Sequence, residues 1–352
     1  ARPEQGPRFL EICSEVCMLT FTIRRLLLAI PTLLIISFVI YALLEFAPGD
    51  PLGHVPLTIP PEVKEQMRIA LGLDRPWYIR YQMWLLQMVW VEPLVLIDHL
   101  FTTDFSKGMQ RVMSFQARQP VMDIIVQRLP NTMIVVGSSY LLGVMIAVPI
   151  GIYSAYRHYS WFDQLGTFIA MVGFSVPTFF TGVVMIIIFS VTLGWLPSIY
   201  DTTLKVTDWS SLWQQIRQMI MPVSVLALYN AAQISRYMRS SMLDNLGQDY
   251  VRTARAKGMS ERTVVLKHVL RNSLIPVVTV IALGIPQIFG GAIITEQVFK
   301  VNGLGQQLIT SIQSNDAPMV MTLTFIFAIL IVLFNLVADL LYGVLDPRIR
   351  YE

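Results

Sequence analysis

The feature that most constrains this chain is a series of long stretches without a charged side chain. They run over residues 26–44, 129–156, 164–200, 218–235, 272–295 and 317–338. At a rise of about 1.5 Å per residue, each is near or above the length that crosses about 30 Å of hydrocarbon. Charged residues make up 14% of the chain and apolar residues 54%, whereas roughly a quarter of a soluble protein is charged. The sequence therefore predicts an all-α polytopic membrane protein with six transmembrane helices.

The third stretch, residues 164–200, is longer than one span requires and contains Pro177. It is compatible with two short helices that meet at the proline, or with one long helix that is kinked or tilted. Backbone groups in a bilayer must form their hydrogen bonds internally. This requirement favours the single kinked helix.

The distribution of lysine and arginine predicts the orientation. These residues are denser in the segments on the side of the N-terminus than in those on the other side, which makes the first side cytoplasmic. An even number of spans places both termini there. The predicted organisation is listed in chain order: a cytoplasmic tail over 1–25, a first span over 26–46, an external segment over 47–128, a membrane core over 129–345 that includes a cytoplasmic loop over 236–271, and a cytoplasmic tail over 346–352.

Several function classes lack the residues that they need. The chain has no Gly-x-x-x-x-Gly-Lys-Ser/Thr loop to hold ATP phosphates, and its four histidines and two cysteines have no metal-ligand spacing. We therefore predict no catalytic residue, no metal and no cofactor in this chain. The basic residues form no continuous run, which argues against nucleic acid as a partner. A secondary carrier or channel remains an alternative, but no span carries the mid-membrane charge that ion coupling requires.

Small and polar residues within the spans have two interpretations each. Ser139, Gly143, Ala147 and Gly151 recur every four residues and form a stripe that lets another helix approach, either within the chain or at a subunit seam. We interpret the neutral polar side chains at mid-span first as groups that form hydrogen bonds between helices, and second as groups that line a hydrated path. The possible translocation path would then include Pro177, Asn230, Gln233 and Gln287.

The cytoplasmic loop contains a short basic helix. Its alanine-rich and arginine-rich sequence suits a helix, and Gly258 suits the end of that helix. Ala254 and Gly258 are four residues apart, so we expect one face to offer small residues to a groove. The remaining members of the predicted coupling segment are Arg252, Thr253, Arg255, Ala256 and Lys257. An ordinary positive-inside loop that touches anionic lipid is the alternative.

Two sequences around this loop carry a family resemblance. Tyr-Val-Arg-Thr-Ala-Arg-Ala-Lys-Gly from Tyr250, followed by Lys-His-Val-Leu-Arg-Asn-Ser-Leu-Ile-Pro up to Pro276, resembles the coupling motif of dipeptide/oligopeptide ABC-importer permeases. Other motifs agree in order: Ile23-Arg24-Arg25-Leu26, Ala47-Pro48-Gly49-Asp50-Pro51, Leu71-Gly72-Leu73-Asp74-Arg75-Pro76, Arg128-Leu129-Pro130, Asn302-Gly303-Leu304-Gly305 and Asp346-Pro347-Arg348. The resemblance extends from Met18 to the C-terminus.

The resemblance implies a type I ABC-importer permease fold in a bacterial inner membrane. It implies a second, similar permease that completes the pathway, two cytoplasmic ATP-binding subunits that dock on Arg252–Gly258, and an external solute-binding protein that delivers a peptide. ATP and Mg²⁺ would be bound by those partner subunits. Permeases for nickel, glutathione and oligosaccharide share these motifs and remain alternatives, as does an assembly subunit of a membrane complex.

The sequence departs from the family pattern after Trp84. An apolar insertion over Val89–Phe101 precedes Asp104-Phe105-Ser106 where a compact Gly-Asp-Leu-Gly element is expected. An exposed apolar run is costly unless it meets protein or lipid. We therefore expect the insertion to form part of a docking or lid surface.

Overall fold

The computed structural model describes residues 7–46, 60–70 and 72–345, except for the side chains of 7–19, 21, 70, 286–291 and 341–345. The described elements are α-helices and short π-helical turns, together with one isolated β-bridge between Met113 and Pro120. The all-α prediction is confirmed. The motifs at 47–51 and 346–348 lie outside the described residues.

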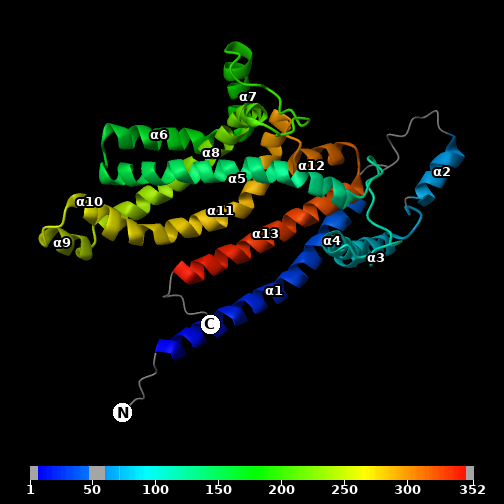
Figure 1. Ribbon diagram of the computed structural model, residues 1–352, viewed down its shortest axis with the longest axis horizontal. Helices are drawn as coiled ribbons and strands as arrows, with labels where there is room; N and C mark the ends of the chain where they lie inside the picture. The colour runs from blue at the N-terminus through cyan, green and yellow to red at the C-terminus, as the bar shows by residue number, and fades with distance from the viewer. Residues whose placement is uncertain (1–6, 47–59, 71, 346–352) are drawn as a thin grey trace. The chain divides into compact units, whose positions relative to one another are not determined.

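Five of the six predicted spans each lie within one helix, and the third, over 164–200, is divided between two helices (Figure 1). The helices are α1 (Pro7–Glu45), α5 (Val121–Tyr156), α6 (Trp161–Ser175) with α7 (Thr178–Met185), α8 (Trp209–Leu246), α11 (Leu270–Phe299) and α13 (Ala317–Leu345). By length and apolarity, five described helices could cross a membrane, or up to six if the bent pair α6 and α7 is one span. The five include Trp77–Phe101 from the predicted external segment and do not include α8.

The expectation of one long kinked helix at Pro177 is wrong. α6 ends at Ser175, α7 begins at Thr178, and the two helices are bent by 104°. Val176 adopts an extended conformation (φ −83°, ψ 125°), as a residue before proline prefers. The proline also has no N–H to continue the helix. The chain then continues through a π-helical turn, η2 (Ile186–Thr192).

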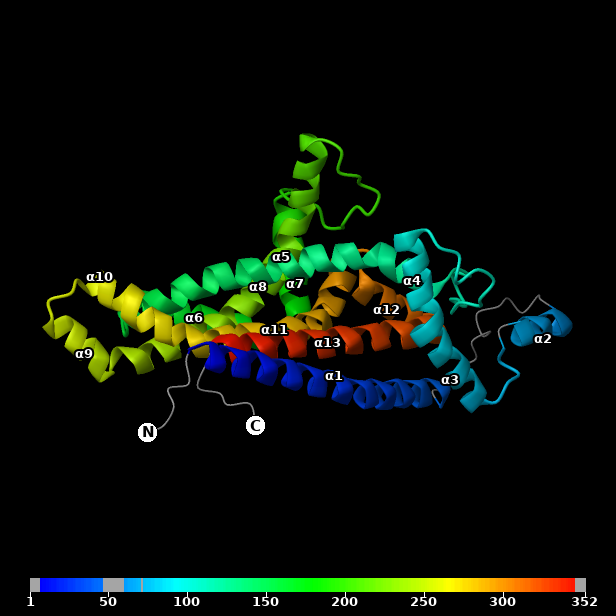
Figure 2. The ribbon, with the colours of Figure 1, turned by 60° about the horizontal axis from the view of Figure 1, so that its bottom comes forward.

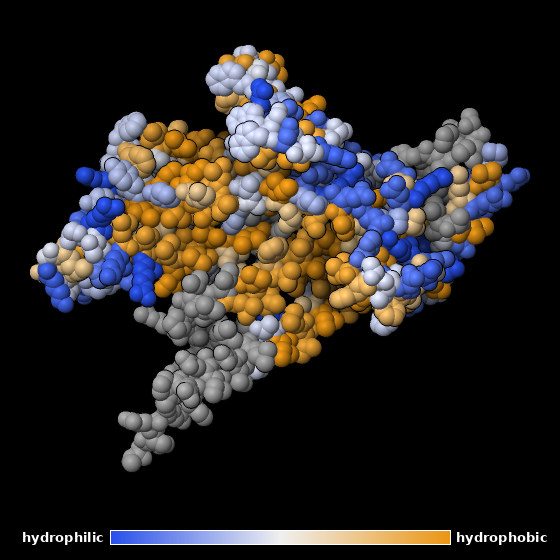
Figure 3. All heavy atoms as spheres, viewed as in Figure 1, coloured by the Kyte–Doolittle hydropathy of each residue, from blue (hydrophilic) through white to orange (hydrophobic). Residues whose placement is uncertain are grey.

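The contacts divide the chain into two compact units. The first unit contains Ala1–Ala29, Asn131–Asn302 and Leu330–Glu352, and the second contains Ile30–Pro130 and Gly303–Ile329. In the first unit, α8 packs against both α6 and α11 (Figure 2). Hydrophobic side chains cover much of the face of this unit in Figure 3, whereas hydrophilic ones gather over α9 (Asp249–Ala256) and α10 (Glu261–Thr263).

The stripe of small residues on α5 packs within the chain. A Cβ atom at Gly151 would lie 2.6 Å from Met238 Cβ, and one at Gly143 would lie 3.0 Å from Asn230 Cβ, so α8 sits directly against the stripe. Ser139 and Ala147 are fully buried. Of the two interpretations of the stripe, the structure confirms packing within the chain.

In the second unit, a helix formed by α3 (Trp77–Leu86), η1 (Gln87–Val91) and α4 (Glu92–Phe101) follows the short α2 (Pro61–Ala70). Trp84 Nε1 donates to Thr322 Oγ1 of α13 at 3.1 Å, and its ring meets Phe325 edge-on at 5.3 Å. Arg80 forms an ion pair with Glu45 at the end of α1. These contacts fasten the helix Trp77–Phe101 to the ends of α1 and α13.

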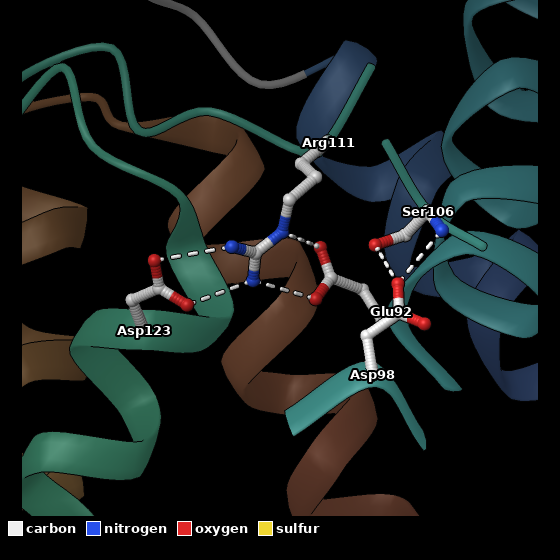
Figure 4. Close-up of polar contacts among 5 residues, drawn as sticks. All are labelled: Glu92, Asp98, Ser106, Arg111 and Asp123. Carbon is white, nitrogen blue, oxygen red and sulfur yellow. Dashed lines mark hydrogen bonds and ion pairs between the residues drawn. The ribbon is translucent and has the colours of Figure 1, made fainter. Parts of the chain in front are cut away.

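A partly buried ion cluster joins α4 to the start of α5 (Figure 4). Arg111 binds both oxygens of Glu92 at 3.1 and 2.8 Å and both oxygens of Asp123 at 3.1 and 2.8 Å. Burial lowers the pKa of Arg111, but the hydrogen bonds to Glu92 and Asp123 outweigh burial and leave the pKa above its ordinary value. Asp98 accepts from the backbone and hydroxyl of Ser106 and so closes the turn after α4.

Candidate coupling and transport sites

The predicted coupling segment forms a helix that ends where the sequence predicted. α9 runs from Asp249 to Ala256, and Gly258 follows with φ +74°. A left-handed residue just beyond a helix end is a conformation that glycine adopts without steric cost. Gly258 N–H donates to Arg255 O at 2.9 Å, which closes the last turn.

The face that we expected Ala254 to offer points into the chain. Ala254 is 6% exposed and Val251 is fully buried, and both belong to a core cluster with Met242 of α8 and Val265 of the following π-helical turn, η3 (Val264–Val269). The expectation that Ala254 enters a partner's groove is therefore wrong. Its small side chain instead lets α9 lie close against the end of α8, which fixes the segment to the membrane core.

The opposite face of this segment is exposed and basic. Its exposed residues are Arg252, Thr253, Arg255, Ala256, Lys257 and Gly258. Arg255 binds Glu261 through two hydrogen bonds of 2.7 and 3.1 Å, and this interaction raises the pKa of Arg255. Arg252 is 3.5 Å from Asp249, but both side chains are largely exposed, so this pair is weak. The face can therefore receive an acidic surface.

An ion pair that the sequence did not predict joins α6 to α8. Asp163 of α6, whose side chain is 3% exposed, accepts from Arg239 Nε and Nη2 at 2.6 and 2.7 Å. Asp163 also accepts from the Tyr159 N–H at 2.9 Å. A Ser-x-x-Asp sequence from Ser160, in the polar break between two spans, was the available signal for a capped helix start. The pair ties the start of α6 to the part of α8 that leads into α9.

The predicted path residues do not form one group in the described structure. Pro177 is exposed at the bend, while Asn230 and Gln233 are half-buried on α8. No hydrogen bond to either α8 side chain is found among the described residues, so the interpretation as interhelical hydrogen bonds gains no support within this chain. Gln287 lies in α11, and its side chain is outside the described residues. Among the described side chains, no group of three or more His, Cys, Asp or Glu could hold a metal ion.

Two family models together match nearly the whole chain. The model described as binding-protein-dependent transport system inner membrane component matches residues 147–351. The model of the N-terminal part of such membrane components matches residues 18–136. The second match contains the apolar insertion, and the first contains the coupling segment.

Individual proteins are similar over their full length. The oligopeptide transport system permease protein AppB of Bacillus subtilis is 40% identical over 338 residues, which are 95% of this chain and 100% of AppB. The glutathione transport system permease protein GsiC of Salmonella paratyphi A is 36% identical over 339 residues, covering 95% of this chain and all of GsiC. An inward-facing structure of the MetNI methionine ABC transporter aligns with a TM-score of 0.51 at 20% identity, covering 65% of this chain and 99% of that chain.

Proposed function

Because the chain belongs to the family of binding-protein-dependent transport system inner membrane components, we propose that it forms half of the pathway by which an ATP-driven importer moves peptides. The observation that carries the substrate class is the full-length similarity to an oligopeptide permease. Glutathione, itself a small peptide, is the second candidate because GsiC is similar over the same length. The chain is a transport subunit and not an enzyme.

In this proposal a second permease completes the pathway, and an external binding protein delivers the solute. Two cytoplasmic subunits bind ATP and Mg²⁺ and dock on the exposed basic face of α9. Closure of these ATPases moves the coupling segments and alternates access to the path. Asn230 and Gln233 are available to line the path because no protein hydrogen bond is found for them in the described part of the chain.

The geometry supports a direct route for that motion. Val251 and Ala254 seat α9 in the core cluster next to α8, so a push on α9 moves α8 rather than a loose loop. The Asp163–Arg239 pair carries the same displacement to α6. Such a pair, nearly buried on the carboxylate side, resists separation because breaking it leaves a charge in a poorly solvated place.

Contacts in the second unit support an external location for residues 77–128. Arg80 binds Glu45 at the end of α1, and Asp316 at the start of α13 accepts from the Ser114 hydroxyl and from the Phe115 N–H at 3.1 Å. Glu45 and Asp316 lie on the external side if both termini are cytoplasmic. The helix Trp77–Phe101 then begins and ends on that side, along the membrane rather than across it.

The experiment that tests the coupling role is Gly258→Arg in vesicles that contain all subunits. A Cβ at Gly258 meets nothing within 4 Å, so the substitution adds bulk and charge to the docking face and a left-handed backbone penalty of about 1–2 kcal/mol. Gly247→Arg is the matched control, since Gly247 also has open space around it but has φ −83° and precedes α9.

We expect Gly258→Arg to insert normally and to lose both peptide uptake and transport-stimulated ATP hydrolysis, while Gly247→Arg retains most of each activity. Normal uptake and hydrolysis in Gly258→Arg would contradict docking at α9. Binding of peptides and of glutathione to the cognate external protein decides the substrate separately.

A further inference from the structure

The second unit contains a cavity of about 780 Å³ that the transport proposal does not use. Its walls come from three apolar helices, including the C-terminal end of α1 and the N-terminal end of α13. They include Tyr41 and Leu44 of α1, Trp84 and Gln87 of the helix Trp77–Phe101, and Pro318 and Met321 of α13. With the topology given under Proposed function, on which this inference rests, the cavity lies where α1 and α13 leave the hydrocarbon on the external side.

A buried hydroxyl in the wall of this cavity has no partner. Tyr41 is 8% exposed, and its hydroxyl makes no hydrogen bond with any described residue. Its ring packs against Tyr81, with the centroids 5.3 Å apart, so the side chain is held in place. A buried polar atom without a partner is costly, and a bound acceptor oxygen removes that cost.

The cavity wall is also rich in arginine. Arg80 is neutralised by Glu45, and Arg111 is fully engaged by Glu92 and Asp123. Arg75 differs from these two, because the acceptor that its guanidinium has among the described residues is the Met83 thioether sulfur, at 3.0 Å. Thioether sulfur is a weak acceptor. An anion in the cavity would offer Arg75 a far stronger one.

The helix Trp77–Phe101 presents an apolar stripe beside the cavity. Its exposed members recur at helical spacing and include Leu86, Val89, Trp90, Leu96, Leu100 and Phe101. A stripe of this kind, with a tryptophan within it, is typical of a helix that lies in the membrane interface. The stripe would meet acyl chains. Gln87, four residues before Val91 in the same helix, lines the cavity.

We propose that this cavity binds the phosphodiester headgroup of an anionic phospholipid, with Tyr41 and Arg75 as donors to the phosphate oxygens and the apolar stripe against the acyl chains. Any ligand of this cavity would share one chemical group, a phosphate oxygen that accepts hydrogen bonds. The lipid is the favoured source because the cavity and the stripe share one helix at the membrane surface. The site is independent of which solute the transporter moves.

The test is native mass spectrometry of the delipidated full chain in detergent with added phosphatidylglycerol or phosphatidylcholine. The variants are Tyr41→Phe and Arg75→Gln, which remove a donor without removing a strong contact of the folded chain. The controls are Tyr78→Phe and Arg118→Gln, because both residues are exposed in the same unit and line no part of the cavity. Thermal unfolding of each variant without lipid confirms that it is folded.

We expect the wild type and both controls to prefer phosphatidylglycerol over phosphatidylcholine. Tyr41→Phe and Arg75→Gln should each lose about tenfold in phosphatidylglycerol affinity, the size of one charge-assisted hydrogen bond. Equal binding of both lipids, or unchanged affinity in both variants, overturns the proposal. If inorganic phosphate or a peptide binds with the same dependence on Tyr41 and Arg75 while phosphatidylglycerol does not, the lipid assignment is wrong.

Discussion

Replacing Gly151 with alanine tests how closely α5 and α8 must approach. The new Cβ would lie 2.6 Å from Met238 Cβ and 2.8 Å from the backbone oxygen of Ser235. Ordinary contacts between carbon atoms are about 3.5–4.0 Å, so the helices must separate locally by close to an ångström. The Met238 Cγ atom can rotate aside, but Met238 Cβ and the Ser235 carbonyl are fixed to the α8 backbone and cannot.

Two opposing effects determine the size of the change. Overpacking a tight core costs about 1–3 kcal/mol, whereas replacing glycine by alanine within a helix gains up to about 1 kcal/mol. Gly137→Ala isolates the second effect, because Gly137 lies in the same helix and a Cβ there meets nothing within 4 Å. Gly143→Ala is intermediate, since its Cβ would lie 3.0 Å from Asn230 Cβ.

The measurement is the free energy of unfolding of the three variants in one detergent system. We expect the order of stability to be Gly137→Ala, then Gly143→Ala, then Gly151→Ala. The first and last should differ by about 1–3 kcal/mol, the overpacking cost alone. If Gly151→Ala and Gly137→Ala agree within about 0.5 kcal/mol, which is the level of ordinary surface substitutions, then α5 and α8 are not packed as described.

Three further predictions concern topology, coupling and a helix start. In a chain without its native cysteines, a cysteine at Asp104 should react with an impermeant reagent added outside and one at Ser260 should not; reversed labelling would refute the orientation. Arg239→Gln should lower uptake more than ATP binding and destabilise the chain by roughly 3 kcal/mol, because it leaves a buried charge on Asp163. The Asp163→Asn/Arg239→Gln double variant should be less destabilised. A double variant whose loss of stability equals the sum of the two single losses rules out the pair. Hydrogen bonds from Ser211 lower the pKa of Asp208. The Asp208 carboxylate therefore stabilises α8 fully above the ordinary pKa of 3.8, and this stabilisation is lost as the pH falls through the lower pKa of the folded chain. A melting temperature of Asp208→Asn that still shows this acid dependence would contradict the role of Asp208.

The elements that sequence predicted well are those with local causes. The Ala-rich and Arg-rich run and the glycine after it determine α9 and its end, because helix propensity and a left-handed cap act within a few residues. The four-residue spacing of Ser139, Gly143, Ala147 and Gly151 predicts a flat helix face in the same way. What faces that stripe is a tertiary fact, and sequence left it open between another part of the chain and another subunit.

The elements that sequence missed depend on contacts between distant segments. Ala254 is small in either interpretation, and only its packing in a cluster with Met242 and Val265 decides that it is buried rather than offered to a partner. Arg239 and Asp163 are 76 residues apart, so neither spacing nor periodicity joins them. At Pro177, the rule that membrane backbone keeps its hydrogen bonds favoured a continuous helix, but local proline sterics prevailed.

The bend at Pro177 also constrains what can surround this part of the chain. The carbonyl of Gly173 loses the donor that a continuous helix would supply, and the first amides of α7, at Thr178 and Phe179, have no preceding turn to accept them. In lipid tails each such orphaned group costs several kcal/mol, whereas water or another protein surface satisfies it. The bend is therefore a place that lipid must not reach. It requires a hydrated or proteinaceous neighbour.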